Sequence, residues 1–287
     1  MWISDLYQCA KTARTLEKWS QLPAPLKREV ARNNFKLRLS PTAGTETSLL
    51  GYRIKFPAAG ILKELYREVF VEAIYFFRSG KDDPIIIDCG SSIGVSVLFF
   101  KKLYPKSKII AFEPDPFTFE ILTENVKRNG LTNVELHQCA LSDSDDPITF
   151  YRPLDADASS LRMNSFQPRA ANSHAITVQA KRLSHFIDES DVDLLKMDIE
   201  GAEHRVLREI TDSGKIRKIK RIHLEYHHHL EIACDNLSSL LRSLEENDFG
   251  YQLRASGPPW PSEGVFQDML IYFYRKNPAI KRTDLDT

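Results

Sequence analysis

The sequence lacks paired cysteines, an excess of one charge and long apolar runs. Its four cysteines, Cys9, Cys89, Cys139 and Cys234, are scattered without a C-x-x-C pair, which argues against a disulfide framework and a cysteine-based zinc site. Lys and Arg total 39, as do Asp and Glu, so no basic field favours a nucleic-acid partner. No apolar run is long enough to span a bilayer, and the amino terminus has no signal-peptide core. We therefore expect a cytoplasmic protein without a membrane span.

A glycine turn is the first informative stretch, and residues 85–94 read IIIDCGSSIG. Three consecutive isoleucines predict a strand buried on both faces, as in a parallel sheet. Apolar residues then recur at helical spacing from Val95 to Leu103, and Pro105 ends the pattern. Gly90 permits a tight turn, and Gly94 permits close approach of a ligand or the neighbouring strand. The stretch predicts a strand, a turn and a helix.

The spacing within this turn is D-x-G-x-x-x-G, with Ser91 and Ser92 in the middle. A dinucleotide site has G-x-G-x-x-G, with amides aimed at a pyrophosphate, so a nicotinamide-dependent oxidoreductase is disfavoured. A cofactor with a nucleoside and an amino-acid tail but no phosphate fits better, and S-adenosylmethionine is such a cofactor. Any tight strand-to-helix turn favours glycine, so the turn alone does not identify the cofactor.

An acid on the next strand supports the nucleoside interpretation. Residues 108–114 predict a strand that ends in Glu113, 23 positions after Gly90. At about this distance an acid on the second strand reaches ribose hydroxyls, and one carboxylate can accept from both. Asp115 caps the predicted helix that follows, and residues 134–140 predict a third strand.

Two later strands also end in ionisable groups. Residues 193–204 predict a strand with Lys196 and Asp198 on one face, followed by a helix. A lone buried ammonium is too costly, so Lys196 should pair with Asp88 or Asp198. Residues 221–227 predict a fifth strand that ends with Glu225 and His227.

We expect two parts in the chain. Residues 1–80 form a mainly helical extension, with helices near 3–20 and 62–77, a strand at 51–56 and a solvated basic stretch at 27–38. Residues 81–280 form the cofactor-binding domain, with a strand-loop-strand insertion near 146–180. Whether the extension covers a pocket or only supports packing stays open.

Four motifs together carry a family resemblance. IIIDCGSSIG, IIAFEPDP, NVELHQCALSD and DLLKMDIEGAE, in this order, resemble the FkbM family of S-adenosylmethionine-dependent methyltransferases over roughly residues 65–275. The resemblance implies the α/β class I methyltransferase fold, a Rossmann-like, doubly wound sheet of seven mostly parallel strands in the order 3-2-1-4-5-7-6. It also implies O-methylation of a sugar or natural-product hydroxyl.

Carried over by motif, the resemblance implies three groups of cofactor contacts. The methionine end lies beside the first turn, the ribose beside the second strand and the adenine edge beside the third, with Asp198 also at the cofactor. The residues expected at the methionine end are Asp88, Gly90, Ser91, Ser92 and Gly94. Those expected at the ribose are Glu113 and Pro114, and those at the adenine edge are Ala140 and Leu141.

Methyl transfer from a sulfonium needs the acceptor oxygen held behind the methyl group, and a base or metal helps an unactivated hydroxyl. The catalytic candidates are the groups at the ends of the fourth and fifth strands: Asp198, Glu200, Glu225 and His227. Asp198 ranks first and His227 next, although Asp198 can serve only to neutralise Lys196 and Glu200 only to favour a helix start. A divalent ion bound by Asp198, Glu225 and His227 is a hypothesis, and a surface histidine cluster at residues 227–229 is favoured over it. The expected partner is a small-molecule or glycan hydroxyl. An N-methyltransferase and a non-catalytic binding protein are the alternatives.

Overall fold

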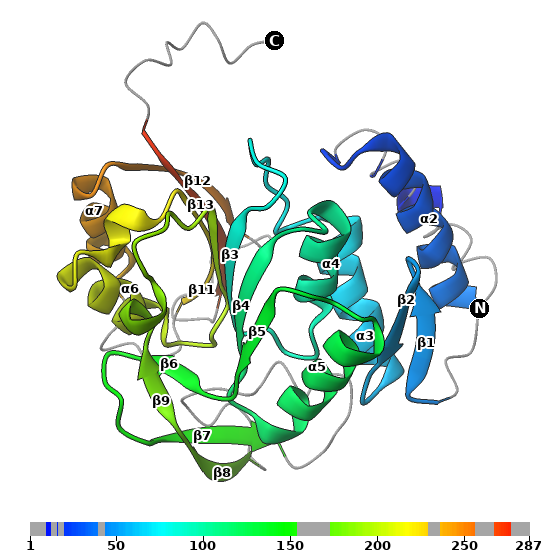
Figure 1. Ribbon diagram of the computed structural model, residues 1–287, viewed down its shortest axis with the longest axis horizontal. Coiled ribbons are helices and arrows are strands. Elements are labelled where there is room, and N and C mark those ends of the chain that lie inside the picture. Colours follow the sequence, from blue (N-terminus) through cyan, green and yellow to red (C-terminus); the bar gives the residue numbers. More distant parts are fainter. Residues whose placement is uncertain are drawn as a thin grey trace, which may run out of the picture.

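A seven-stranded sheet forms the centre of the molecule (Figure 1). The computed structural model describes residues 10–12, 16, 20–39, 44–153, 173–228, 236–255 and 267–276. The sheet order is β5-β4-β3-β10-β11-β13-β12, which corresponds to 3-2-1-4-5-7-6 in chain order. Its strands are β3 (Ile85–Cys89), β4 (Lys108–Phe112), β5 (Val134–His137), β10 (Leu194–Met197), β11 (Arg221–His228), β12 (Phe249–Ala255) and β13 (Gln267–Arg275). All pairs are parallel except those of β13, which is antiparallel to β11 and β12. The predicted fold class and strand order are confirmed.

Helices cover both faces of the sheet (Figure 1). One face is covered by α4 (Val95–Leu103) and α5 (Pro116–Arg128). The other face is covered by α6 (Glu203–Asp212) and α7 (Leu237–Glu246). Along β3, Ile86 belongs to the first core, whereas Ile87 and Cys89 belong to the second. This alternation explains the unbroken apolar run, because every side chain of a doubly covered strand is buried.

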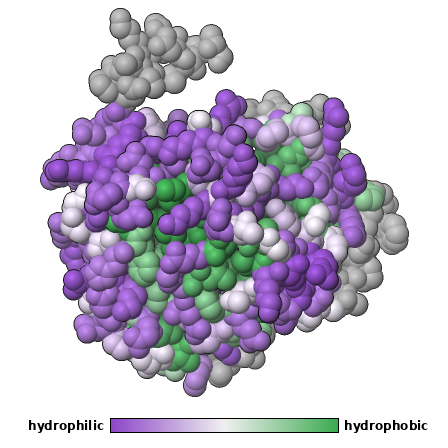
Figure 2. Space-filling model, in the orientation of Figure 1, coloured by the Kyte–Doolittle hydropathy of each residue, from purple (hydrophilic) through white to green (hydrophobic). Residues whose placement is uncertain are grey.

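Asp115 and Pro116 begin α5 as the sequence predicts. The Asp115 carboxylate accepts hydrogen bonds from the amides of Phe117 and Thr118, and Pro116 occupies the first turn. Short one-turn helices lie at η3 (Leu183–Phe186) and η4 (Lys215–Lys218). None of the described helices is long and apolar enough to cross a membrane. Polar side chains cover most of the face shown in Figure 2, and hydrophobic ones gather near its centre.

The amino-terminal part differs from its prediction in two places. The stretch expected to be solvated lies in a helix, α2 (Ala24–Leu39), which buries Leu26, Val30 and Leu37. Its apolar residues are few, but their helical spacing puts them on one face, so burial outweighs the many charges. The helix expected over 62–77 ends earlier, because Ala73 has a left-handed φ of 52°.

The remaining elements of this part are one hairpin and one bent helix. They are β1 (Glu46–Leu49), β2 (Tyr52–Lys55), α3 (Ala59–Tyr66) and the π-helix η1 (Arg67–Val71). The expected strand at 51–56 is confirmed as β2. Of the helix expected near 3–20, most residues lie outside the described part of the chain. Residues from α2 to Phe77 share one core with α4 and β3, so the proposed boundary at residue 80 divides the sequence but not the core.

The segment after β4 is more divided than expected. The strand predicted over 134–140 splits, because Ala140 leaves the large sheet and starts β6 (Ala140–Ser142), which pairs in parallel with β9 (Ala180–Arg182). The predicted strand-loop-strand insertion is present as β7 (Ile148–Pro153) and β8 (Ser173–Val178), an antiparallel pair. Its intervening loop lies outside the described residues. In Figure 1 these four strands lie below the lower edge of the large sheet, toward which β5 runs.

Candidate active site

The ionisable residues expected in the site gather at one edge of the sheet. Parallel strands present their carboxyl ends together, and ligands of open α/β sheets bind outside those ends. In the register of the sheet Asp88 lies opposite Lys196, and Lys196 opposite His223. Continuing the strands by two residues brings Asp198 to the level of Glu225.

The glycine turn abuts the end of β10. Gly90 has a φ of +82°, and a Cβ atom there would lie 1.8 Å from the carbonyl oxygen of Asp198. Gly94 also has a left-handed φ, but a Cβ there would lie 2.7 Å from Leu122 Cδ1 of α5. The close protein neighbour of Gly94 is therefore a helix side chain, rather than the neighbouring strand, and the approach of a ligand there remains a prediction.

Lys196 joins the turn to β10 from within the core. Its ammonium lies 3.3 Å from Asp88 Oδ1 and 3.7 Å from Asp198 Oδ2, so the predicted pairing is confirmed with both acids. It also donates to the carbonyl oxygens of Cys89 and Gly90, at 3.2 and 2.6 Å. Burial lowers the pKa of Lys196, but the two carboxylates outweigh burial and raise it overall.

Asp88 and Ser91 face the interior of the turn. The Asp88 carboxylate is fully buried and accepts a hydrogen bond of 2.5 Å from Ser96 Oγ on α4. Ser91 Oγ donates to the carbonyl oxygen of Asp88 at 2.9 Å. These side chains hold the turn against the sheet, so any contact of theirs with a cofactor at the methionine end remains a prediction.

Glu113 is tied to the same turn from β4. One carboxylate oxygen accepts from the Ser92 amide at 2.9 Å and the other from the Asp115 amide at 3.0 Å. Burial raises the pKa of Glu113 to about 8 even though both hydrogen bonds oppose the shift. Pro114 follows it, half-buried at the edge, whereas Ala140 and Leu141 are buried in β6 beyond the end of β5.

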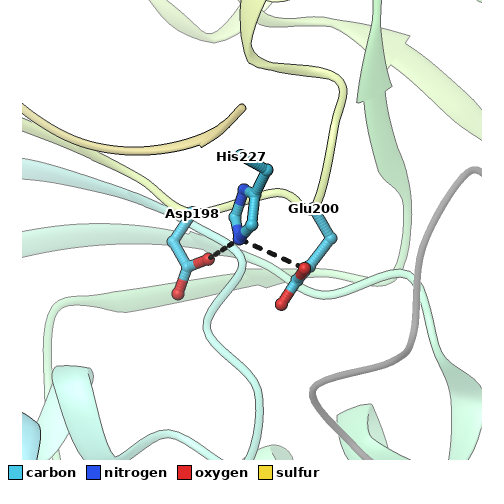
Figure 3. Close-up of side chains that lie close together, drawn as sticks. All are labelled: Asp198, Glu200 and His227. Atoms are coloured by element: carbon cyan, nitrogen blue, oxygen red, sulfur yellow. Dashed lines mark ion pairs between the residues drawn. The ribbon is translucent and has the colours of Figure 1, made fainter. Parts of the chain in front are cut away.

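Three side chains converge at the carboxyl ends of β10 and β11: Asp198, Glu200 and His227 (Figure 3). His227 Nε2 lies 3.2 Å from Glu200 Oε2 and 3.8 Å from Asp198 Oδ1. The opposite ring nitrogen, Nδ1, donates to Glu203 Oε1 at 2.7 Å. His227 is buried, so the prediction of a surface histidine cluster is wrong at this position. Residue 229 and the side chain of residue 228 lie outside the described part of the chain.

The charges around His227 alter its expected chemistry. Burial lowers the pKa of His227, but the carboxylates of Glu200 and Glu203 outweigh burial and raise it well above the ordinary value. A raised pKa favours the protonated ring, which makes His227 a weaker candidate for the base than we expected. Asp198, which is a quarter exposed, is the better candidate for a base.

A large groove lies at the other edge of the sheet. Its volume is about 1080 Å³, and it is lined by the first residues of three strands, Ile85, Lys108 and Val134, among others. It contains none of the candidate site residues. Because the amino ends of parallel strands do not form the ligand crevice of this architecture, the groove is separate from the candidate active site.

Comparison with known proteins identifies the family. The model of the methyltransferase FkbM domain matches residues 88–253. The chain belongs to the FkbM methyltransferase family. The chain is an S-adenosylmethionine-dependent methyltransferase, and its sheet has the strand order that the resemblance implies.

Several relatives of this FkbM-family chain are named methyltransferases. It is 35% identical over 175 residues to Methyltransferase 1 of Beauveria bassiana, covering 54% of this chain and 70% of that protein. It is 29% identical over 220 residues to 31-O-demethyl-FK506 methyltransferase FkbM of Streptomyces tacrolimicus, covering 64% and 81%. It is 30% identical over 163 residues to 2-O-methyltransferase NoeI of Sinorhizobium fredii, covering 51% and 64%.

Two residues that sequence reasoning missed complete the site of this FkbM-family chain. Tyr75, which precedes the matched domain, places its hydroxyl 3.2 Å from Asp198 Oδ2 and 3.5 Å from Glu225 Oε2. Glu225 therefore faces Tyr75, and the three clustered side chains do not include it. Glu203 belongs to the DIEGAE motif, but only the fold shows that it reaches His227. No local pattern around Tyr75 signals its contact with a strand more than a hundred residues away.

Proposed function

We propose that this protein transfers a methyl group from S-adenosylmethionine to a hydroxyl of a sugar, glycan or natural-product small molecule. The observation that carries the proposal is the convergence of Asp198, Glu200 and His227 directly beside the glycine turn. A hydroxyl must lose its proton as it is methylated, so a site for O-methylation needs groups that attract a proton or a cation.

The residues at the sheet edge fit the methyl donor. Gly90, Ser92 and Pro114 are each partly exposed there. The Glu113 carboxylate uses each oxygen for one backbone amide, which leaves acceptor capacity for two ribose hydroxyls. Asp88, Ser91 and Gly94 would support this turn, and Ala140 with Leu141 would border the adenine.

Asp198 is the residue best suited to receive the acceptor's proton. Its Oδ2 lies near the Tyr75 hydroxyl and Lys196, whereas its Oδ1 faces the cluster with His227. When bound, S-adenosylmethionine supplies a methyl group on a positively charged sulfur, which keeps the electron pair of the broken carbon–sulfur bond. The acceptor oxygen forms the new bond to carbon, and its proton passes to Asp198 Oδ1.

The names of two relatives support the choice of oxygen as acceptor. FkbM of Streptomyces tacrolimicus is named for methylation at an O-31 position, and NoeI of Sinorhizobium fredii is named a 2-O-methyltransferase. Nitrogen is the alternative acceptor, and an amine would not require a strong base. The balanced charge of the chain supports a small-molecule or glycan acceptor over nucleic acid, and a cytoplasmic location remains a prediction from the cysteine pattern.

A labelled-donor screen tests the proposal. Purified protein is incubated with radiolabelled S-adenosylmethionine and a panel of sugars, sugar nucleotides and hydroxylated natural products. Transfer to a hydroxylated acceptor is expected, and Asp198→Asn should reduce turnover by at least about tenfold while donor affinity stays nearly constant. Asp191→Asn is the matched control, because Asp191 is exposed at the opposite sheet edge. Full turnover by the Asp198 variant would remove this residue from the mechanism.

A further inference from the structure

We propose that Asp198, Glu200 and His227 form a binding site for one divalent transition-metal cation, with Mn²⁺ as the reference ion. The site itself follows from the geometry of the three side chains. Its chemical role, to bind the acceptor hydroxyl, rests on the function proposed above. Glu225, a ligand in the metal hypothesis from the sequence, is replaced by Glu200.

The spacing of the three side chains suits a shared cation. One ligand atom from each of them lies within 4.8 Å of the other two, and His227 Nε2 lies 3.2 Å from Glu200 Oε2. Nitrogen and oxygen ligands bound at about 2.1 Å to one ion are about 3.0–3.4 Å apart in octahedral or tetrahedral geometry. The Asp198 oxygen lies farther from the same nitrogen, at 3.8 Å, so its side chain would move toward a bound ion.

The histidine is oriented as metal-binding histidines are. Glu203 accepts from His227 Nδ1 at 2.7 Å, and the same carboxylate accepts from the Gly201 amide. A carboxylate behind a ligand histidine fixes the tautomer, so the Nε2 lone pair points toward the ion. In Figure 3 this nitrogen points between Asp198 and Glu200. Glu203 thus positions a ligand and does not itself belong to the set.

The local charge and exposure also favour a cation. Three carboxylates, of Asp198, Glu200 and Glu203, surround one imidazole, and the Lys196 ammonium, 3.7 Å from Asp198, is shared with Asp88. The His227 side chain is 3% exposed, whereas those of Asp198 and Glu200 are 25% and 21% exposed. A bound ion would therefore have a protein side and a side open to the crevice, as catalytic metal sites have.

The ligand set indicates the class of ion. One imidazole with two carboxylates suits Mn²⁺, Fe²⁺ or Zn²⁺ better than Mg²⁺, which prefers oxygen ligands. An ion in this position would bind the acceptor hydroxyl through an open position and lower the pKa of that hydroxyl. With the ion bound, Asp198 Oδ1 would be a ligand instead of the proton acceptor, and the acceptor's proton would pass to water as the oxygen–carbon bond forms.

Binding of Mn²⁺ alone tests the site without any methyl acceptor. Electron paramagnetic resonance of free Mn²⁺, titrated with the full chain, should show one tight site per chain. Glu200→Gln should weaken that site at least about tenfold, whereas Glu225→Gln, a matched carboxylate just outside the set, should change affinity less than about twofold. No tight site, or a site that Glu200→Gln leaves intact, would overturn the proposal. A site weakened by Glu225→Gln as strongly as by Glu200→Gln would overturn the ligand assignment.

Two further measurements separate this proposal from the proposed function. Mn²⁺ should raise the melting temperature of the wild type but not of folded Glu200→Gln. Calorimetry with S-adenosylmethionine in a chelator should show unchanged donor affinity, while chelation abolishes turnover and Mn²⁺ restores it. If Mn²⁺ binds as expected but no hydroxyl is methylated, the metal site stands and the function fails. Full turnover after chelation would remove the ion from the chemistry.

Discussion

The hydroxyl of Tyr75 lies 3.2 Å from Oδ2 of Asp198. This contact joins the segment before the matched FkbM domain to the end of β10, 123 positions later in the chain. Burial and the charge of Asp198 raise the pKa of Tyr75 well above its ordinary value, so the hydroxyl stays protonated and donates. The Lys196 ammonium lies 5.1 Å from the centre of the same ring. The amino-terminal part thus supplies a residue that positions Asp198, the candidate base.

Tyr75→Phe is predicted to reduce turnover about tenfold and to leave donor affinity within about twofold. A hydrogen bond to a charged group contributes about 1.5–3 kcal/mol, and its loss would let the Asp198 carboxylate rotate. The check is a comparison of turnover and donor titrations with those of Tyr104→Phe. Tyr104 also makes hydrogen bonds through its hydroxyl, to Phe77 and Ser79, but away from the site. Equal turnover in the two variants would contradict a positioning role.

Gly90→Ala is predicted to destabilise the fold by more than about 2 kcal/mol and to abolish donor binding. The added methyl would lie 1.8 Å from the Asp198 carbonyl oxygen, so the turn and the end of β10 must separate. Gly51→Ala is the control, since Gly51 has a φ of +83° but no atom within 4 Å of a Cβ. That variant should lose only about 1 kcal/mol. Urea unfolding and donor calorimetry measure both effects, and normal donor binding by Gly90→Ala would refute the geometry.

Glu113→Gln is predicted to weaken donor binding by about 1–3 kcal/mol, because the ribose hydroxyls lose a charged acceptor. The pKa of about 8 adds a pH signature. Hydroxyl donors favour the ionised carboxylate, so wild-type affinity should increase as pH rises from 6.5 toward 8.5. Calorimetry on both proteins gives the ratio of their donor affinities. The ionisation of the donor itself affects both affinities equally and therefore drops out of this ratio. A ratio that does not change with pH, or unchanged affinity in the variant, would contradict the ribose assignment.

His223→Phe is predicted to make the fold less sensitive to acid. Burial, aided by Arg221, lowers the pKa of His223 to about 3, whereas an unfolded histidine titrates near 6.5. Below that pH the unfolded state binds a proton that the native state does not, so the free energy of unfolding falls by about 1 kcal/mol per pH unit. Phenylalanine can keep the edge contact with Tyr272 but cannot titrate.

Urea unfolding at pH 7, 6 and 5 checks this prediction. The stability difference between wild type and His223→Phe should shift in favour of the variant as pH falls. A substitution at the exposed His185, His185→Gln, serves as the control for the loss of a surface histidine. Parallel pH curves for wild type and His223→Phe would show that His223 gains its proton in the native state.

Much of the fold was predictable because each central strand is apolar on both faces and ends at a turn or an acid. The Ile85–Ile87 run, the cap at Asp115 and the Lys196 pairing all follow from local pattern and from the cost of burying a charge. The helix at α2 was missed because only three of its apolar residues are well buried on a highly charged segment. The split between β5 and β6 depends on pairing with β9, which local sequence cannot indicate.

The candidate site was predictable only in part. Asp198, His227 and Glu113 were identified, because each follows an apolar strand. The sequence hypothesis placed Glu225, rather than Glu200, beside His227. Both residues lie near the ends of neighbouring strands, and only the path of the chain brings Glu200 to His227. The left-handed φ of 53° at Glu200 is a feature of that path, and it has no sequence signature at a non-glycine residue.

The product formed from a ¹³C-methyl donor tests the central claim most directly. The full chain is incubated with ¹³C-methyl S-adenosylmethionine and hydroxylated acceptors, with and without Mn²⁺, and the carbon spectrum of the purified product is recorded. The account predicts a new methyl resonance in the range of methyl ethers, absent with Gly90→Ala. Two results would contradict the account: a product whose new methyl resonance is that of an N-methyl group, or methylation of an amine while no hydroxylated acceptor is methylated.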